Sequence, residues 1–267
     1  MELHAIADRP VSPPRFSQGR LLVRLLSEMQ TSCAVAGQRV FEGELDRSII
    51  FMVIARESGL LSSCSDGVAR WDGAGPRAIS INALAASLSR PFETVLRHVN
   101  ALIAQGLCVR TPAGVMKPAE VHERPAIAAL FRVHHDALAR LAEDMVAFDI
   151  TRPETRPHFA YDWHTGLAAA HDILLSGIEF YSAQYPHWID MALVGTGICA
   201  NARPFTYDRE IARSYADFTR LVPERLRAPV PASLVARVLT LPASTAQRRV
   251  NAMIAAGVLI RKPGGGC

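Results

Sequence analysis

Glutamate and arginine stand four residues apart in one segment of this chain, and other polar side chains take related places 151 residues further on. Glu93 and Arg97 would project from the same face of a helix. Arginine can hold guanine through two hydrogen bonds and glutamate can accept one from cytosine, so this pair could read base edges. Gln247 and Arg248 are equally suitable types in the second segment. The plainer alternative is an ordinary surface ion pair between Glu93 and Arg97.

Both segments belong to an internal repeat. Residues 91–112 and 242–263 align at a constant offset of 151 without a gap, and 11 of the 22 positions are identical. Most of the other positions keep their apolar or polar character. A match of this quality indicates a duplicated unit, so each copy should fold in the same way.

Each copy predicts two helices joined by a short turn. Apolar residues at helical spacing indicate a first helix over 82–88 in one copy and over 232–239 in the other. The second helix is predicted over 91–105 and 242–256, with proline at its first position in both copies. Its apolar residues form one stripe, so the opposite face should be exposed.

The ends of these helices carry recognisable signals. Asn82 and Ser233 are the expected N-cap residues of the two first helices. Gly106 and Gly257 follow the two second helices, where a residue in the left-handed conformation commonly ends a helix.

A small β-hairpin is expected after the first copy only. Residues 107–110 are β-prone, 111–114 have turn chemistry and 115–117 can return as a second strand. The second copy has a β-prone run at 258–261 and no residues suited to a returning strand. We therefore expect its hairpin to be incomplete, either vestigial or completed by another segment.

Helix, turn, helix, glycine and hairpin together make a winged helix-turn-helix. The string ETVLR at 93–97 resembles the recognition helix of the catabolite-activator (Crp/Fnr) group, and the helix–glycine–strand–arginine pattern is similar to MarR-type regulators. The resemblance covers the two cores, 79–118 and 228–267. It implies a sequence-specific bacterial transcription regulator whose helices at 91–105 and 242–256 enter the major groove of double-stranded DNA.

The expected DNA contacts combine base-reading side chains on the two second helices with basic side chains on or near the wings. In the first copy they are Arg90, Glu93, Thr94, Arg97, Asn100, Arg110 and Lys117. In the second copy they are Ser244, Thr245, Gln247, Arg248, Arg249, Asn251, Arg261 and Lys262.

The charge distribution agrees with two DNA-binding units. The chain of 267 residues has a formal net charge of +4. Residues 79–118 carry +3 and residues 225–267 carry +7, whereas the intervening 119–224 carry −6. Positive charge confined to the two repeated units favours one specific DNA contact by each unit over indiscriminate binding of polyanions.

The chain as a whole is expected to be mainly α-helical, with two winged helix-turn-helix domains, additional packing or dimerisation helices and small β-wings. The additional helices are predicted at 21–39, 126–148 and 161–180. The expected organisation is a tail at 1–20, a first domain at 21–148, a linker at 149–157 and a second domain at 158–267, with coil also at 9–15 and 62–76.

A larger duplication is suggested by two apolar segments that precede the winged helices. Residues 41–53 and 181–193 align by eye, and both would be helical. The second copy would then hold extra residues, placed within 195–210.

Other classes of protein find little support. The five cysteines form no CxxC pair, and neither HExxH, a phosphate-binding glycine loop nor a nucleophile motif occurs, so we expect no enzyme, catalytic residue, cofactor or metal site. Five histidines at 134, 135, 158, 164 and 171 cluster only loosely. Without a long apolar run or a recognisable secretory signal, we expect a cytoplasmic, nucleoid-associated protein with no membrane partner.

Several alternatives stay open. One chain with two heads could imitate a two-fold dimer on asymmetric half-sites, whereas a homodimer would present four heads. A plasmid-type replication initiator is closely related, and a chromosome-partition scaffold, expected to be acidic, is the different-class alternative. A set of mostly aromatic residues is either core or the lining of a pocket for a small-molecule effector: Trp163, Phe180, Tyr181, Tyr185, Trp188 and Met191.

Overall fold

The protein is mainly helical, as the sequence predicts. The computed structural model describes residues 18–59, 77–152, 161–182, 184–185 and 187–262. The tail 1–17, the predicted coil at 62–76, most of the linker 149–157 and residues 263–267 lie outside this part of the chain. Within it, every described element is a helix except one two-stranded sheet.

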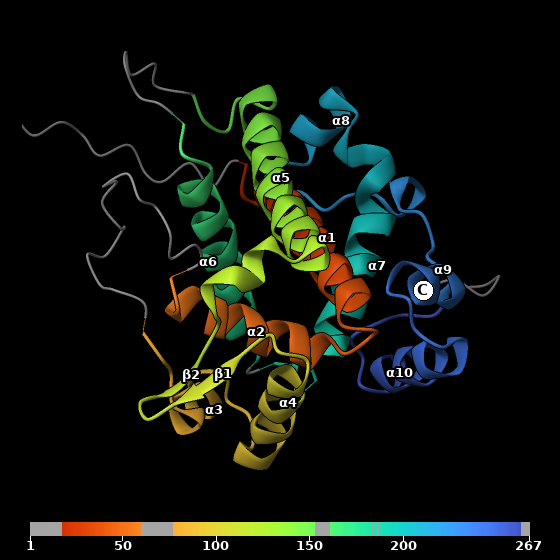
Figure 1. Ribbon diagram of the computed structural model, residues 1–267. Helices are drawn as coiled ribbons and strands as arrows, with labels where there is room; N and C mark the ends of the chain where they lie inside the picture. Colours follow the sequence, from red (N-terminus) through yellow and green to blue (C-terminus); the bar gives the residue numbers. More distant parts are fainter. Residues whose placement is uncertain (1–17, 60–76, 153–160, 183, 186, 263–267) are drawn as a thin grey trace, which may run out of the picture.

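Long helices form the body, with α1 (Gly19–Val40) at its centre. α5 (Pro125–Ala147) and α7 (Trp188–Thr206) pack along α1 (Figure 1). Both run antiparallel to it: the end of α5 meets the start of α1, where the Gln18 amide donates to the Phe148 carbonyl. The predicted helices at 21–39 and 126–148 are thus confirmed to within two residues.

α6 (Trp163–Ser182) packs against α5 and confirms the helix predicted at 161–180. The helix predicted at 181–193 is wrong in its first half, because α6 extends to Ser182 and α7 begins only at Trp188. The predicted segment therefore contains the end of one helix and the start of the next.

The first copy of the repeat is held by α2 (Leu45–Glu57), which is buried on most of its surface. α3 (Ile81–Ser87) and α4 (Phe92–Ala104) both pack against it. β1 (Val109–Thr111) and β2 (Gly114–Met116) then form an antiparallel hairpin in which Val109 pairs with Met116 and Thr111 with Gly114. A bridge from Ile79 to Val115 adds the segment just before α3 to this sheet.

Gly114 makes that bridge possible. Its φ is +140°, and a Cβ atom there would lie 2.3 Å from the Ile79 carbonyl oxygen. Since no side chain fits into this space, the wing depends on glycine at the turn.

The second copy follows α7. The short α8 (Arg209–Ser214) lies between α7 and the copy, which consists of α9 (Ala232–Val238) and α10 (Ala243–Ala255). Two short 3-10 helices complete the described elements, η2 (Ala119–Glu123) after the wing and η3 (Glu224–Leu226) before α9. Both repeats therefore follow a helix of the body, α2 or α7.

The N-caps differ from the sequence prediction, whereas the C-terminal glycines agree with it. α3 is capped by Ser80, whose hydroxyl accepts from the Ala83 amide at 3.1 Å, rather than by Asn82, which lies inside the helix. α9 begins after Pro231, so Ser233 is likewise internal. Gly106 and Gly257 have φ values of +67° and +72°, confirming the predicted left-handed helix ends.

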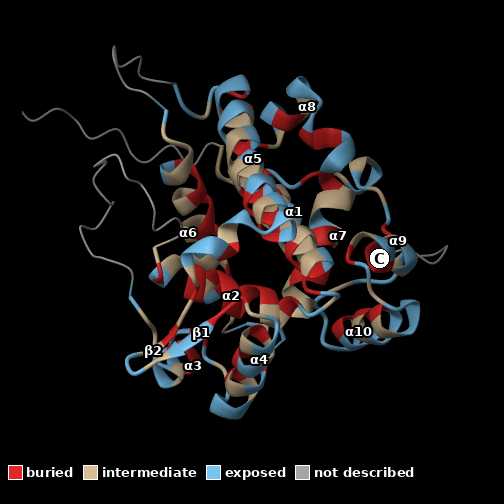
Figure 2. Ribbon diagram, viewed as in Figure 1, coloured by how far each residue is buried: buried red, intermediate tan, exposed pale blue. Residues whose placement is uncertain are grey.

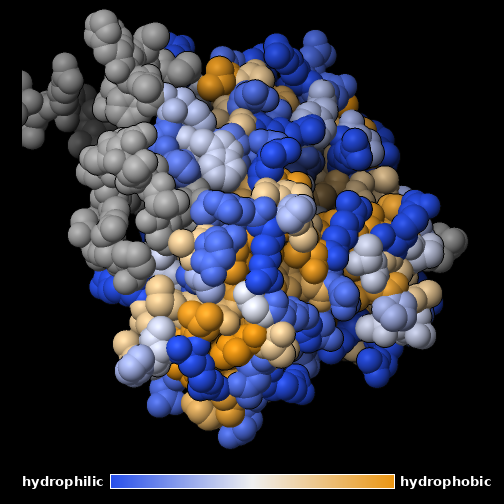
Figure 3. All heavy atoms as spheres, in the orientation of Figure 1, coloured by the Kyte–Doolittle hydropathy of each residue, from blue (hydrophilic) through white to orange (hydrophobic). Residues whose placement is uncertain are grey.

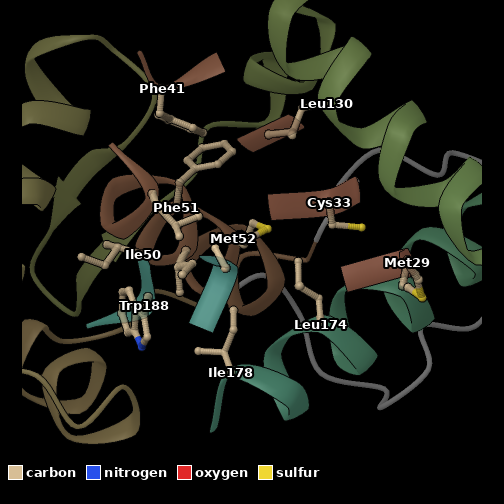
Figure 4. Close-up of a cluster of buried hydrophobic side chains, with 14 of the residues drawn as sticks. Met29, Cys33, Phe41, Ile50, Phe51, Met52, Leu130, Leu174, Ile178 and Trp188 are labelled. Carbon is tan, nitrogen blue, oxygen red and sulfur yellow. The ribbon is translucent and has the colours of Figure 1, made fainter. Parts of the chain in front are cut away.

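One continuous core joins the body to both repeats (Figure 2). It extends from Leu21 in α1 to Met253 in α10. Figure 4 shows side chains of α1, α2 and α6 meeting within it, among them Met29, Met52 and Leu174. The predicted boundary at 149–157 stays a prediction, because most of its residues lie outside the described part of the chain.

None of the helices in the described segments has a stretch long and apolar enough to cross a bilayer.

Candidate nucleic-acid interface

The turn between the two helices has the same backbone structure in both copies. Ser89 and Thr240, 151 residues apart, both have φ of +50°. The next residue closes the turn in each case: Arg90 N–H donates to the Ala85 carbonyl at 2.9 Å, and Leu241 N–H donates to the Ala236 carbonyl at 2.8 Å. The sequence repeat is therefore also a structural repeat at this level.

α4 and α10 bury equivalent faces. Val95, Val99 and Leu102 of α4 are buried, as are the corresponding Ala246, Val250 and Met253 of α10. Both helices thus expose the opposite face, and the residues there also correspond. The exposed pairs are Phe92 and Ala243, Glu93 and Ser244, Arg97 and Arg248, and Asn100 and Asn251.

A hydrogen bond from an arginine to an asparagine recurs in the two copies. The Arg110 guanidinium, in β1, donates from Nη2 to Asn100 Oδ1 at 2.7 Å. The Arg261 guanidinium donates from Nη2 to Asn251 Oδ1 at 2.8 Å. The amide oxygen in each second helix therefore holds an arginine of the following segment against the exposed face. Sequence reasoning named these residues singly and missed their pairing, although their identity in both copies was a signal for it.

Arg97 and Arg248 have no partner in the part of the chain that the structure describes. Both are exposed, and neither forms an ion pair or a side-chain hydrogen bond there. Glu93 does not pair with Arg97, so the simple surface ion pair considered from the sequence is not formed among the described residues. Two arginines at equivalent positions thus point free guanidinium groups to solvent.

The two exposed faces are not identical. In α10, Gln247 Nε2 donates to Asn251 Oδ1 at 3.0 Å, so a polar row lies beside Arg248. In α4 the residue at the position of Gln247 is Leu96, and Phe92 is 40% exposed. Figure 3 also shows hydrophobic surface over β1 and β2. The first face is therefore more apolar than the second.

Lys117 is a correction to the expected site. It is fully buried, and its ammonium group donates to the Pro118 carbonyl at 3.2 Å. Burial lowers the pKa of this lysine. The side chain turns into the protein just after β2, so it cannot contact DNA on the surface of the wing.

Three other basic residues of the expected site are engaged within the protein. The Arg90 guanidinium lies 4.1 Å from the ring centre of Trp188, the first residue of α7. Arg249 forms an ion pair with Asp190 at 3.2 Å, and Lys262 pairs with Glu224. These side chains fasten the repeats to the body, and we leave them out of the candidate interface.

The remaining expected residues stay at the surface. Thr94 and Thr245 are half-buried in the first turns of their helices, and Ser244 is exposed. With Glu93, Arg97, Asn100 and Arg110 on one side and Gln247, Arg248, Asn251 and Arg261 on the other, they make up the two candidate faces.

The second wing is not formed in the described residues. Residues 258–261, predicted as β-prone, are not a strand there. A strand needs a hydrogen-bonding partner, and the residues that return to pair with β1 in the first copy have no counterpart among the described residues of the second. Val258 is consequently 44% exposed and Ile260 74% exposed, whereas Leu107, which corresponds to Val258, is 8% exposed.

The histidines of the middle region separate into different environments. His134 and His171 form a fully buried pair between α5 and α6, with Nδ1 of the first 2.8 Å from Nε2 of the second. His135 lies against the Trp163 ring instead. No group of three or more side chains suited to a metal ion occurs in the described segments.

No protein-family model matches the chain, and neither a curated protein nor a solved structure is significantly similar to it.

Proposed function

We propose that the two repeats are winged helix-turn-helix units and that the chain is a sequence-specific regulator of transcription that binds double-stranded DNA. α4 and α10 would be its two reading helices. The observation that carries the proposal is the recurrence of a free, exposed arginine, Arg97 or Arg248, beside an asparagine that holds a second arginine.

An α-helix fits the major groove of B-DNA, where arginine recognises guanine by donating to O6 and N7. Arg97 and Arg248 are one turn into their helices, a suitable place for this contact. Arg110 and Arg261 are already oriented by Asn100 and Asn251, so less conformational entropy would be lost when they meet a phosphate.

The two faces would read different sequences. Glu93 and Leu96 in α4 can accept from cytosine and contact a thymine methyl group, whereas Ser244 and Gln247 in α10 can hydrogen-bond to other base edges, adenine among them. One chain could thus bind two unlike half-sites, in contrast to a two-fold dimer. The acidic segment 119–224 would keep the body away from the phosphates.

Selection of bound sequences from random duplex DNA tests this proposal. We expect an enriched motif with two unlike halves, and an affinity that falls steeply with salt as bound cations are released from the phosphates. Recovery of iterated repeats typical of a replication origin would favour the initiator. A flat salt response with no enriched motif would favour a protein-interaction scaffold and contradict the proposal.

A further inference from the structure

A small cavity lies between the helices that carry the two repeats. It is bounded by α1, α2, α6 and α7 and has a volume of about 120 Å³. Side chains of α2 and α6 that Figure 4 shows in the core, Met52, Leu174 and Ile178, form part of its wall. Of the residues considered from the sequence for an effector pocket, Tyr181, Tyr185 and Met191 also lie along it, whereas Trp188 packs against Arg90 instead.

Small residues account for the empty space. Gly177 and Gly195 let α6 and α7 approach α1 closely: a Cβ atom on Gly177 would lie 2.1 Å from Gln30 Nε2, and one on Gly195 would lie 3.1 Å from Thr31 Oγ1. Ala34 and Ala192 also line the cavity, and their side chains are too short to fill it. The backbones are thus near one another while the space between the side chains stays open.

The lining has no charged side chain and few polar groups. The Ser27 hydroxyl already donates to the Val23 carbonyl, at 2.8 Å. Thr31 Oγ1 lies 3.7 Å from Cys199 Sγ. The Gln30 amide, by contrast, has no hydrogen-bond partner in the described part of the protein, although it borders the cavity. An ionised ligand would be left without a counter-charge, and a neutral one could bond to Gln30.

We infer that this cavity binds a neutral, mainly apolar molecule the size of one aromatic ring, oriented by a hydrogen bond to Gln30. A dry cavity of roughly 150 Å³ lined by apolar side chains accommodates benzene, which is the scale of the space here. Walls from four helices would bury most of the surface of so small a ligand.

The position of the cavity gives such a ligand a consequence. α2 packs on α3, α4 and β2, whereas α7 packs on α9 and α10. A molecule wedged between α2 and α7 would change the distance between the two reading helices and hence the affinity for a fixed pair of half-sites. This part of the inference rests on the proposed function, and the binding of the ligand does not.

Thermal unfolding and titration with toluene, phenol and benzoate test the site directly. Toluene and phenol should raise Tm with increasing concentration, because they bind only the folded state, and benzoate should not. Gln30→Leu should weaken the binding of phenol at least fivefold and leave the affinity for toluene unchanged. Equal stabilisation by benzoate, or phenol binding that Gln30→Leu does not alter, would overturn the assignment.

Filling the cavity provides the matched control. Ala34→Leu should weaken the binding of toluene and of phenol at least tenfold without lowering Tm in the absence of ligand. If this variant unfolds, Ala192→Val provides a smaller change. Retention of both ligands by a folded filled variant would show that they bind elsewhere.

The coupling is measured by titrating the selected duplex with and without saturating toluene. We expect at least a threefold change in Kd, which Ala34→Leu abolishes. If the affinity for DNA does not change when toluene is bound, the proposed effect of the cavity ligand on DNA binding is overturned, and the ligand site itself is not. Failure of the protein to bind DNA at all would instead contradict the proposed function and leave the ligand site standing.

Discussion

A basic side chain can contact nucleic acid only if its charged end is exposed and has donors that point to solvent. Arg97 and Arg248 meet both conditions in the described part of the chain, whereas Lys117 meets neither. Formal charge counted along the sequence therefore overstates the charge available at the first wing.

Lys117→Met is expected to leave the affinity for DNA within twofold and to leave stability unchanged or raised. The ammonium group is buried with one carbonyl partner, and removing a poorly paired buried charge seldom costs stability. Titration of the selected duplex and denaturant unfolding measure the two quantities. A tenfold loss of affinity in a folded variant would place this side chain at the DNA after all.

The buried histidine pair predicts how stability depends on pH. Burial lowers the pKa of His134 to about 4, and the pKa of His171 also falls well below its ordinary value. The unfolded chain therefore binds protons that the folded protein does not, from about pH 6.5 downward. Stability should fall as the pH is lowered toward 4.

The double variant His134→Leu/His171→Leu isolates this effect. Between pH 7 and pH 5 the natural chain should lose about 2 kcal/mol more of its free energy of unfolding than this variant through His134 alone, and His171 should add to the difference. Denaturant unfolding at both pH values measures the difference. An equal loss in both proteins would mean that the imidazoles take up protons in the folded state.

At the scale of elements, the repeat makes most of the reading units predictable. Helical spacing of apolar residues locates α3, α4, α9 and α10, and the glycine after each second helix fixes its end. The N-caps differ from the prediction because Asn82 and Ser233 are good capping types in general, although the observed N-caps, Ser80 and Pro231, each lie two residues earlier.

Long-range contacts could not be predicted from local patterns. Arg90 and Trp188 are far apart in the sequence and carry no shared periodicity, yet their contact joins the first repeat to α7. The burial of Lys117 also has no local signal, since alternation along β2 only predicts which face a residue takes and not what covers it. The cavity arises in the same way, from four helices meeting around glycine and alanine.

Gly106 and Gly257 form a matched pair that separates local strain from tertiary contact. Both have left-handed φ, so Gly257→Ala should cost about 1 kcal/mol of stability. Gly106→Ala should cost about 2 kcal/mol, because its Cβ would displace the Arg124 guanidinium, which donates to the carbonyls of Gln105 and Gly106. Denaturant unfolding compares them. Equal costs would show that Arg124 adds nothing to the end of α4.

For the whole molecule, the structure joins two similar units through a shared helical body. The core is continuous from α1 to α10, and the contacts of Arg90 with Trp188 and of Arg249 with Asp190 fix each repeat to α7. α4 and α10, the helices proposed to read DNA, therefore have a defined separation. The +4 charge of the chain accordingly arises from two basic units, 79–118 and 225–267, and the acidic segment 119–224 between them.

Footprinting on the selected duplex tests the central claim most directly, with Arg97→Ala and Arg248→Ala compared with Arg209→Ala, an exposed arginine at the start of α8. Each of the first two variants should lose protection at one half-site, and at different ones, with Kd weakened roughly tenfold or more, as expected for loss of a bidentate base contact. Arg209→Ala should protect both half-sites like the natural chain. Unchanged protection of both half-sites by Arg97→Ala or by Arg248→Ala would contradict the account.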